Sequence, residues 1–271
     1  MQNSGPKTAD TRQTDFNLTR AFWVLLAGVV VLYALGLNEH WRFQRDGPLY
    51  LGLARSMLED GSYTYNGELH TKYPPGLPSM LAGVGYVFGM PDTTSGDFLP
   101  FNALISLFGI GSICLFYLIL RELRSPPWVA FWALLFFALA RTLYYYSAHI
   151  LTDVPFTCFA LATLWCALRM RHADSRGASW GWCVGAGLLA GAASTIRPVG
   201  PLLVPAIAAG LWLNRDALSE WPRRIGQTLV PALLLAVPVG LWSWWTSQAA
   251  TTGKHYFRNK VSSGTIWNVL L

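Results

Sequence analysis

DGPLYLGLARSMLEDGSYTYNGELHTKYPPGLP, residues 46–78, is the longest polar interruption between the first hydrophobic segment and the rest of the chain. It opens with the acid Asp46, closes on a double proline, and carries Lys72 shortly before those prolines. Nearly all of the sequence that follows consists of long apolar blocks. The stretch therefore stands out as a polar loop attached to a set of membrane helices, and it is the first place to look for chemistry.

The composition indicates the class of protein. Of the 271 residues, 53% are hydrophobic and 13% are charged, whereas a soluble domain averages about a quarter charged residues. Because the apolar residues come in blocks, the sequence predicts an all-α polytopic membrane protein. The net charge of +6 does not indicate a nucleic-acid partner, since the basic residues stand singly or in pairs between apolar blocks. The four cysteines lie inside apolar blocks without CxxC spacing, which favours neither disulfides nor a zinc site.

The apolar blocks predict about seven transmembrane helices. They cover residues 21–37, 99–120, 128–140, 154–168, 180–196, 201–213 and 229–245. Residues 1–20 are expected to form a cytoplasmic tail, because Arg20 directly precedes the first block. Residues 21–245 then form the membrane domain, in which residues 38–98 make an extracytoplasmic loop. Residues 246–271 make an extracytoplasmic tail.

Two short amphipathic helices are expected in the first loop. Residues 47–58 place their apolar side chains on one face at i, i+3 and i+4 spacing, and Asp60-Gly61 marks the end of this helix. About a dozen residues are too few to span a bilayer, so the helix is expected to lie in the membrane interface. Residues 78–89 form a second short apolar piece, which either spans the membrane or also lies in the interface. The interfacial alternative places more Lys and Arg residues on the cytoplasmic side, so the positive-inside rule favours it.

Under this topology the residues that could carry chemistry gather on the extracytoplasmic side. They are Asp46, Glu68, His70, Lys72, Tyr73, His149, Asp153, Arg197, Lys254, His255, Arg258 and Lys260. An enzyme that acts there on a lipid-linked phosphate needs a base to take a proton from an acceptor hydroxyl, and cations to stabilise the departing phosphate. Asp46 suits the first role. Lys72, Arg197 and Arg258 suit the second.

Structural roles compete with these assignments at several positions. Asp46-Gly47-Pro48 is also a helix-start signal, and spacing alone favours Asp46 as an N-cap. Thr152-Asp153 has the same ambiguity, and Arg197 serves equally well as a helix-end anchor. His70 and His149 fit ordinary interfacial histidines better than site residues. No histidine or acid in the loop has metal-ligand spacing, so no metal is expected.

The order of these motifs resembles the GT-C glycosyltransferases. Asp46 after the first span, the helix LYLGLARSMLEDGSY and the segment KYPPGLPSML are similar to the first extracytoplasmic loop of the protein mannosyltransferase-like group (glycosyltransferase family 39-like). This group includes the bacterial lipid A aminoarabinose transferases. HILTDVPF at 149–156 and GLLAGAASTIRPVG at 187–200 fit the same group, so the resemblance covers most of residues 21–213.

The resemblance implies a membrane glycosyltransferase that moves a hexose or pentose, with inversion, from a dolichyl or undecaprenyl phosphate to a glycan, lipid or protein acceptor. It makes Asp46 the catalytic base and places Lys72 against the donor phosphate. Further substrate-binding candidates are Tyr73, His149, Asp153, Arg197 and Arg258. It implies no cofactor or metal, a multi-pass location in the cell (inner) membrane, a cytoplasmic N-terminus and an extracytoplasmic active site. Thr71 stands where the family often has a second acid, and the nearest acid is Glu68.

Two other functions stay open at this point. Family members are usually longer than this chain, so an alternative is a non-catalytic polyprenyl-phosphate-binding or partner subunit derived from the same fold. Such a subunit would bind the lipid phosphate without transferring sugar. A transporter is disfavoured, because the ionisable residues lie near the ends of apolar blocks and not in mid-membrane.

Overall fold

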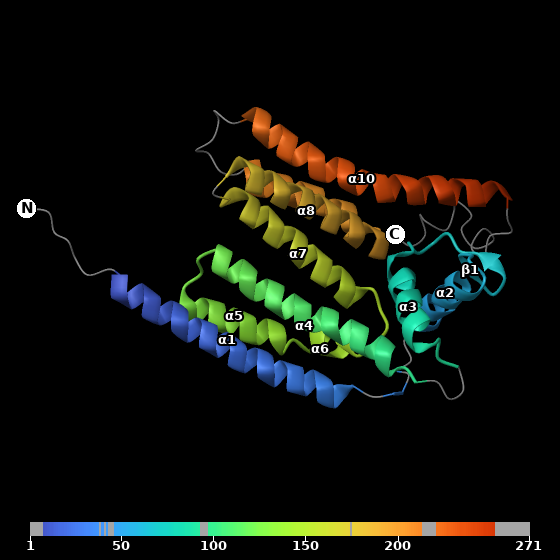
Figure 1. Cartoon of the computed structure of the whole chain (residues 1–271), viewed down its shortest axis with the longest axis horizontal. Coiled ribbons are helices and arrows are strands. Elements are labelled where there is room, and N and C mark those ends of the chain that lie inside the picture. Colours follow the sequence, from blue (N-terminus) through green and yellow to red (C-terminus); the bar gives the residue numbers. More distant parts are fainter. Residues whose placement is uncertain are drawn as a thin grey trace, which may run out of the picture.

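A computed structural model describes residues 8–37, 39–40, 42, 46–92, 97–173, 175–212 and 221–252. In chain order the elements are α1 (Thr8–Gly36), α2 (Gly47–Glu59), β1 (Thr64–Tyr65), β2 (Glu68–Leu69), α3 (Gly76–Phe88), α4 (Leu99–Glu122), α5 (Pro127–Ala138), α6 (Arg141–Ser147), α7 (Asp153–Arg171), α8 (Arg176–Ile196), η1 (Gly200–Leu202), α9 (Leu203–Trp212) and α10 (Trp221–Thr252). Figure 1 shows α1, α4, α5, α7, α8 and α10 side by side as a bundle, with α2, α3 and the hairpin gathered at one end. We call this the loop end.

Each predicted apolar block forms a helix, although several boundaries differ. α1 begins at Thr8, inside the predicted tail, because the polar residues that precede Arg20 do not break a helix. α10 begins at Trp221, before the predicted start at 229. The predicted span 128–140 corresponds to α5, and α6 follows it at an angle of 45°. The two short loop helices are present as α2 and α3.

Three helices of the described residues are long and apolar enough to cross a membrane. They are α4, α7 and residues Trp221–Ala249 of α10, and α5 with α6 makes a fourth if the bent pair is one span. Arg20–Gly36, Gly76–Phe88 and Gly200–Ala209 are shorter apolar helices. The count of about seven spans and the interfacial placement of α2 and α3 therefore stay predictions.

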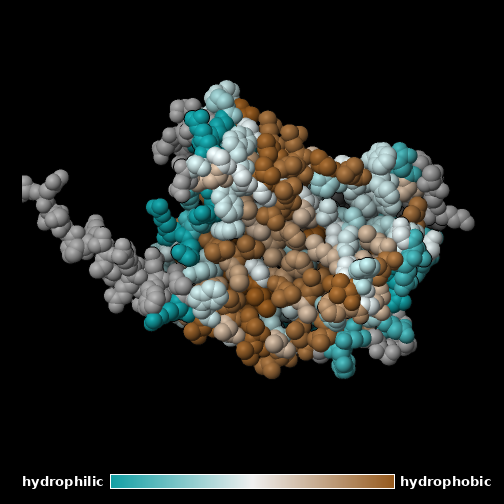
Figure 2. All heavy atoms as spheres, viewed as in Figure 1, coloured by the Kyte–Doolittle hydropathy of each residue, from teal (hydrophilic) through white to brown (hydrophobic). Residues whose placement is uncertain are grey.

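An apolar belt crosses the bundle. Figure 2 shows hydrophobic residues across the middle of the visible face, with hydrophilic residues gathered toward its two ends. On α10, Leu229, Leu233, Val237 and Leu241 recur once per turn and are all more than half exposed. In water such a stripe would be unfavourable, and in a bilayer it faces lipid. The surface therefore agrees with a membrane protein.

Small residues bring α8 and α10 into close contact. A Cβ atom on Gly187 would lie 2.8 Å from the Pro231 Cα atom, and one on Gly191 would lie 3.2 Å from Pro238 Cγ. Small residues at close spacing permit such close helix packing. Gly181 does not share the role, because a Cβ atom there would meet no described atom within 4 Å.

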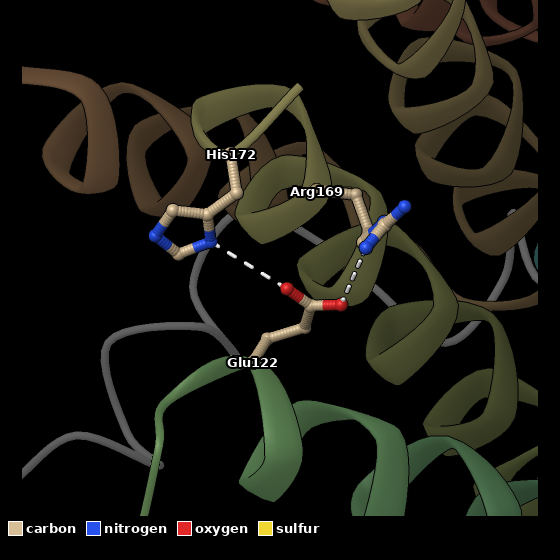
Figure 3. Close-up of polar contacts among 3 residues, drawn as sticks. All are labelled: Glu122, Arg169 and His172. Carbon is tan, nitrogen blue, oxygen red and sulfur yellow. Dashed lines mark hydrogen bonds and ion pairs between the residues drawn. The ribbon is translucent and has the colours of Figure 1, made fainter. Parts of the chain in front are cut away.

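Polar contacts join the helices at the end of the bundle opposite the loop end. Figure 3 shows Glu122 of α4 between two side chains of α7, with its carboxylate 3.1 Å from Arg169 Nη1 and 3.5 Å from His172 Nδ1. Gln227 of α10 donates to Ser179 Oγ of α8 at 2.7 Å. These contacts fix the relative positions of the helices whose opposite ends carry the candidate site residues.

Candidate active site

The first loop is anchored to the bundle through α3. A Cβ atom on Gly76, the first residue of α3, would lie 2.5 Å from the carbonyl oxygen of Thr195 near the end of α8. Only a residue without a side chain permits this approach. The contact places the segment that follows Lys72 against the end of α8, where Arg197 stands directly after the helix.

Asp46 occupies the N-cap position of α2 without acting as a cap. Its φ of −98° and ψ of −12° are helical, whereas a capping residue has an extended backbone that turns its side chain toward the helix amides. Its carbonyl accepts a hydrogen bond from the Tyr50 N–H at 3.2 Å, but no described amide caps onto its carboxylate. The interpretation of Asp46 as a side-chain cap is therefore wrong, and the residue is half-buried.

Asp153 and Arg197 form an ion pair between α7 and the end of α8. Arg197 Nη1 lies 2.6 Å from Asp153 Oδ1, and each side chain is 39% exposed. Thr152, which precedes α7, also has a helical backbone and makes no side-chain capping bond. A purely capping role for Thr152-Asp153 is therefore wrong. The Asp153 carboxylate instead pairs with the Arg197 guanidinium, and both side chains are partly exposed.

Tyr50 links residues that are far apart in the sequence. It lies one turn after Asp46, is 3% exposed, and meets the Tyr73 ring edge-on with centroids 5.4 Å apart. Burial raises the pKa of its hydroxyl, and a hydrogen bond with Thr152 lowers it. Burial is the larger effect, and the pKa is about 12. The charges of Asp46 and Arg197 act on this pKa in opposite directions, so both lie within electrostatic reach of the hydroxyl. Asp46, Tyr73 and Arg197 therefore share one neighbourhood.

The hairpin of β1 and β2 holds Lys72 and Tyr73. Asn66-Gly67 joins its strands with φ values of 54° and 78°, the combination that a type I′ turn needs. Just after β2, His70 Nε2 accepts the Tyr73 N–H at 3.3 Å, and the two rings stack 5.5 Å apart. Lys72 Nζ lies 4.8 Å from the centroid of the same Tyr73 ring. The Lys72-Tyr73 segment is thus attached to His70.

His70 is a buried part of the loop and not an ordinary interfacial histidine. Its side chain is 1% exposed. Burial, together with the positive charge of Lys72, lowers its pKa from 6.5 to about 4. The ring must stay neutral for Nε2 to accept the Tyr73 amide. The low pKa and the hydrogen bond therefore support each other.

Acidification is expected to destabilise the loop through His70. The unfolded chain binds this proton near pH 6.5 and the folded chain near pH 4, so stability falls as the pH drops through that window. The total loss is on the order of 3 kcal/mol. Thermal unfolding in detergent micelles between pH 7 and pH 4 measures it. His70→Gln should flatten the pH dependence, while His172→Gln at the opposite end of the bundle should leave it unchanged. If the unfolding temperature falls with pH equally steeply in the wild type and in His70→Gln, His70 is not the cause of the pH dependence.

Two predicted site residues are not brought to this neighbourhood by a described contact. His149 Nδ1 donates to the Tyr145 carbonyl at 2.6 Å and its ring lies 4.3 Å from the Tyr145 ring. It is not among the groups that act on Tyr50. Arg258, like Lys254, His255 and Lys260, lies outside the described residues.

An apolar groove of about 360 Å³ opens between the loop and α10. Its lining consists of Met57, Tyr63, Pro75, Thr195, Pro238, Leu241, Trp242 and Trp245. Trp242 and Trp245 stack with centroids 5.1 Å apart, and Tyr63 meets both edge-on. Because Pro75 closely follows Lys72 and Thr195 closely precedes Arg197, the groove extends to the segments that carry both cations.

The sequence alone does not single out Tyr50 or Tyr63 as site residues. Tyr50 fits the apolar face of α2, and the i, i+4 spacing from Asp46 says only that the two share a face. Asn66-Gly67 is a recognisable hairpin signal that places Tyr63 opposite His70. No local signal indicates that this hairpin meets α10.

The arrangement combines a carboxylate with two cations. A site of this kind can accept a proton and hold an anion. Among the residues that the structure describes, no group of three His, Cys, Asp or Glu side chains is placed to hold a metal ion. Lys72 and Arg197 are the described side chains that the sequence predicts to meet a phosphate.

The chain is similar to known proteins in sequence and in fold. Residues 72–244, which begin after Asp46, match the family described as dolichyl-phosphate-mannose-protein mannosyltransferase. The structure of ArnT from Cupriavidus metallidurans in the apo state matches with a TM-score of 0.64 and 19% identity, over 83% of this chain and 41% of that chain. The ArnT structure bound to undecaprenyl phosphate matches with a TM-score of 0.63 and 20% identity, over 84% and 42%. This chain thus spans about two fifths of the length of ArnT. No curated protein matches it.

Proposed function

The chain belongs to the dolichyl-phosphate-mannose-protein mannosyltransferase family, whose members are GT-C membrane glycosyltransferases, and from this premise we propose that it transfers a sugar from a polyprenyl phosphate to an acceptor hydroxyl with inversion. The acceptor is a glycan, a lipid or a protein. The fold shared with an ArnT that binds undecaprenyl phosphate supports this class of donor.

In the proposed reaction, Asp46 takes the proton of the acceptor hydroxyl while its oxygen attacks the anomeric carbon. The new glycosidic C–O bond forms as the bond from that carbon to the phosphate oxygen breaks. The electron pair leaves with the polyprenyl phosphate, and the proton passes from Asp46 to water. A single displacement of this kind inverts the anomeric centre.

The leaving phosphate would be stabilised by two cations. The charge of Arg197 acts on Tyr50, and Lys72 lies against the Tyr73 ring. Lys72 and Arg197 supply charge-assisted hydrogen bonds, which are stronger than neutral ones. Asp153 holds the Arg197 guanidinium in a fixed position through the ion pair. Tyr73 lies between Lys72 and Tyr50 and is placed to contact the sugar. The apolar groove along Trp242 and Trp245 suits the first isoprene units of the donor.

The observation that carries the proposal is the convergence on Tyr50. Asp46, Tyr73 and Arg197 come from three separate parts of the chain, and each acts on the same buried hydroxyl. A base and a phosphate ligand that act on one small substrate must lie close together. We propose further that residues 1–20 are cytoplasmic, that residues 38–98 are extracytoplasmic, and that the site opens on the extracytoplasmic side of the cell membrane.

A transfer assay with the purified protein tests the function. The protein in nanodiscs is given a radiolabelled sugar on undecaprenyl phosphate, and product formation is followed on a membrane extract that supplies acceptors. Transfer is expected from the monophosphate donor, and EDTA should not slow it because Lys72 and Arg197 supply the positive charge. Binding of undecaprenyl phosphate without transfer would favour the non-catalytic subunit. Absence of both would overturn the proposal.

A further inference from the structure

Tyr63 holds the Lys72-Tyr73 segment on the side opposite His70. The Tyr63 hydroxyl donates to the Tyr73 carbonyl at 2.9 Å. The Tyr73 N–H donates to His70. Both polar groups of the Tyr73 backbone are therefore bound, one by each residue. The backbone next to Lys72 is fixed from two sides. Tyr63 also lines the apolar groove, so this hydrogen bond joins the groove to the Lys72-Tyr73 segment.

Tyr63 is itself held by the hairpin and by α10. Its carbonyl accepts the His70 N–H at 3.0 Å, which joins the two ends of the hairpin. Its ring meets Trp242 at 5.7 Å and 89°, and Trp245 at 5.9 Å and 77°. Such edge-on aromatic contacts are favourable beyond the area they bury. Because Tyr63 is only 9% exposed, water does not easily replace its hydrogen bond.

We propose that Tyr63 is a positioning residue for Lys72, and that Trp242 and Trp245 of α10 hold Tyr63 in place. This inference rests on the proposed function, in which Lys72 meets the donor phosphate. A lysine side chain is long and flexible, so an ordered backbone at its base reduces the entropy lost when its ammonium binds an anion. α10 thereby sets the affinity for the donor without touching the phosphate.

Tyr63→Phe isolates the hydrogen bond, because it keeps the ring and its contacts with α10. Undecaprenyl phosphate binding to the protein in nanodiscs should weaken about tenfold, the loss expected for one buried hydrogen bond and the order it maintains. In the transfer assay KM for the donor should rise, and kcat should fall by a smaller factor than Lys72→Met causes. In a Lys72→Met background, Tyr63→Phe should have no further effect on binding. Equal losses in both backgrounds would show a merely structural role and overturn the inference.

The α10 contacts are tested with a matched pair of variants. Trp242→Leu combined with Trp245→Leu removes the aromatic contacts with Tyr63 and should weaken binding. Because both tryptophans also line the donor groove, the part of the loss that acts through Tyr63 is the part that disappears in the Lys72→Met background. Trp244→Leu changes a neighbouring tryptophan that is 62% exposed and should bind like the wild type. Equal affinity in both variants would contradict the role of α10.

The reactivity of Lys72 separates this inference from the proposed function. A water-soluble acylating reagent labels lysines, and peptide mass spectrometry reports the rate at Lys72. Tyr63→Phe should change that rate several-fold, whether or not lipid phosphate binds. If the wild type does not bind undecaprenyl phosphate, the proposed function is wrong. The part of the inference that concerns donor binding is then wrong as well. The labelling rate then shows whether Tyr63 orders Lys72. If wild type and Tyr63→Phe bind equally well, the inference alone is overturned.

Discussion

Asp46→Asn is expected to lower kcat for sugar transfer by about 100- to 10,000-fold, the usual contribution of a general base. The amide has nearly the same shape as the carboxylate but cannot accept the proton of the acceptor hydroxyl. Because the Asp46 carboxylate makes no capping bond to α2, the substitution should leave the thermal unfolding temperature unchanged. Binding of undecaprenyl phosphate should also persist, since the phosphate is held by other residues. Initial rates with saturating donor measure the effect.

Asp60→Asn is the matched control for this prediction. Asp60 follows α2 at its other end and is exposed. The same chemical change there should leave transfer close to the wild-type rate. Transfer by Asp46→Asn at more than about a tenth of the wild-type rate would rule out Asp46 as the base.

Lys72→Met is expected to weaken undecaprenyl phosphate binding by about 10- to 100-fold, which corresponds to the loss of a hydrogen bond to a charged group. Methionine keeps the apolar stem that lies along Tyr73 and removes the ammonium. In the transfer assay kcat should fall as well, because negative charge develops on the departing phosphate in the transition state and the ammonium would stabilise it there. Binding to nanodiscs and initial rates, measured on the same preparation, give the two effects separately.

Lys72→Arg distinguishes charge from geometry at this position. Arginine keeps the positive charge but presents it on a longer, planar group. It should recover part of the binding and less of the rate, since the rate depends on precise placement. Full binding by Lys72→Met would exclude Lys72 as a phosphate ligand. Arg197 would then remain as the candidate for that role.

Hydrophobic patterning is sufficient to predict the helices and the loop that they carry. The end of α2 at Asp60-Gly61 follows from local turn chemistry, and Gly61 does adopt a φ of 62°. α1 and α10 extend beyond the predicted blocks, because polar residues can continue a helix that apolar residues anchor. Which of these helices span the membrane depends on the surrounding bilayer as well as on the chain.

The candidate site was predictable as a set of residues but not as an arrangement. Asp153 and Arg197 are charges at the ends of apolar blocks, and Asp46 directly precedes an amphipathic helix; both are local properties. Their convergence depends on the approach of Tyr50 of α2 to Thr152, which precedes α7, and no periodicity encodes that contact. The capping interpretation failed for a related reason. An N-cap needs an extended backbone, and the angles that the loop imposes on Asp46 are not visible in Asp-Gly-Pro.

The Asp153–Arg197 ion pair has a consequence for product release. After transfer, the polyprenyl phosphate carries more negative charge than the donor did, since the ester to the sugar is gone. Two unopposed cations would retain such a product and slow the next cycle. The Asp153 carboxylate, 2.6 Å from the guanidinium, already satisfies part of its charge. It lies ready to take back the guanidinium when the phosphate departs, so the proposed site would exchange one anion for another and would not leave a bare cation at the membrane surface.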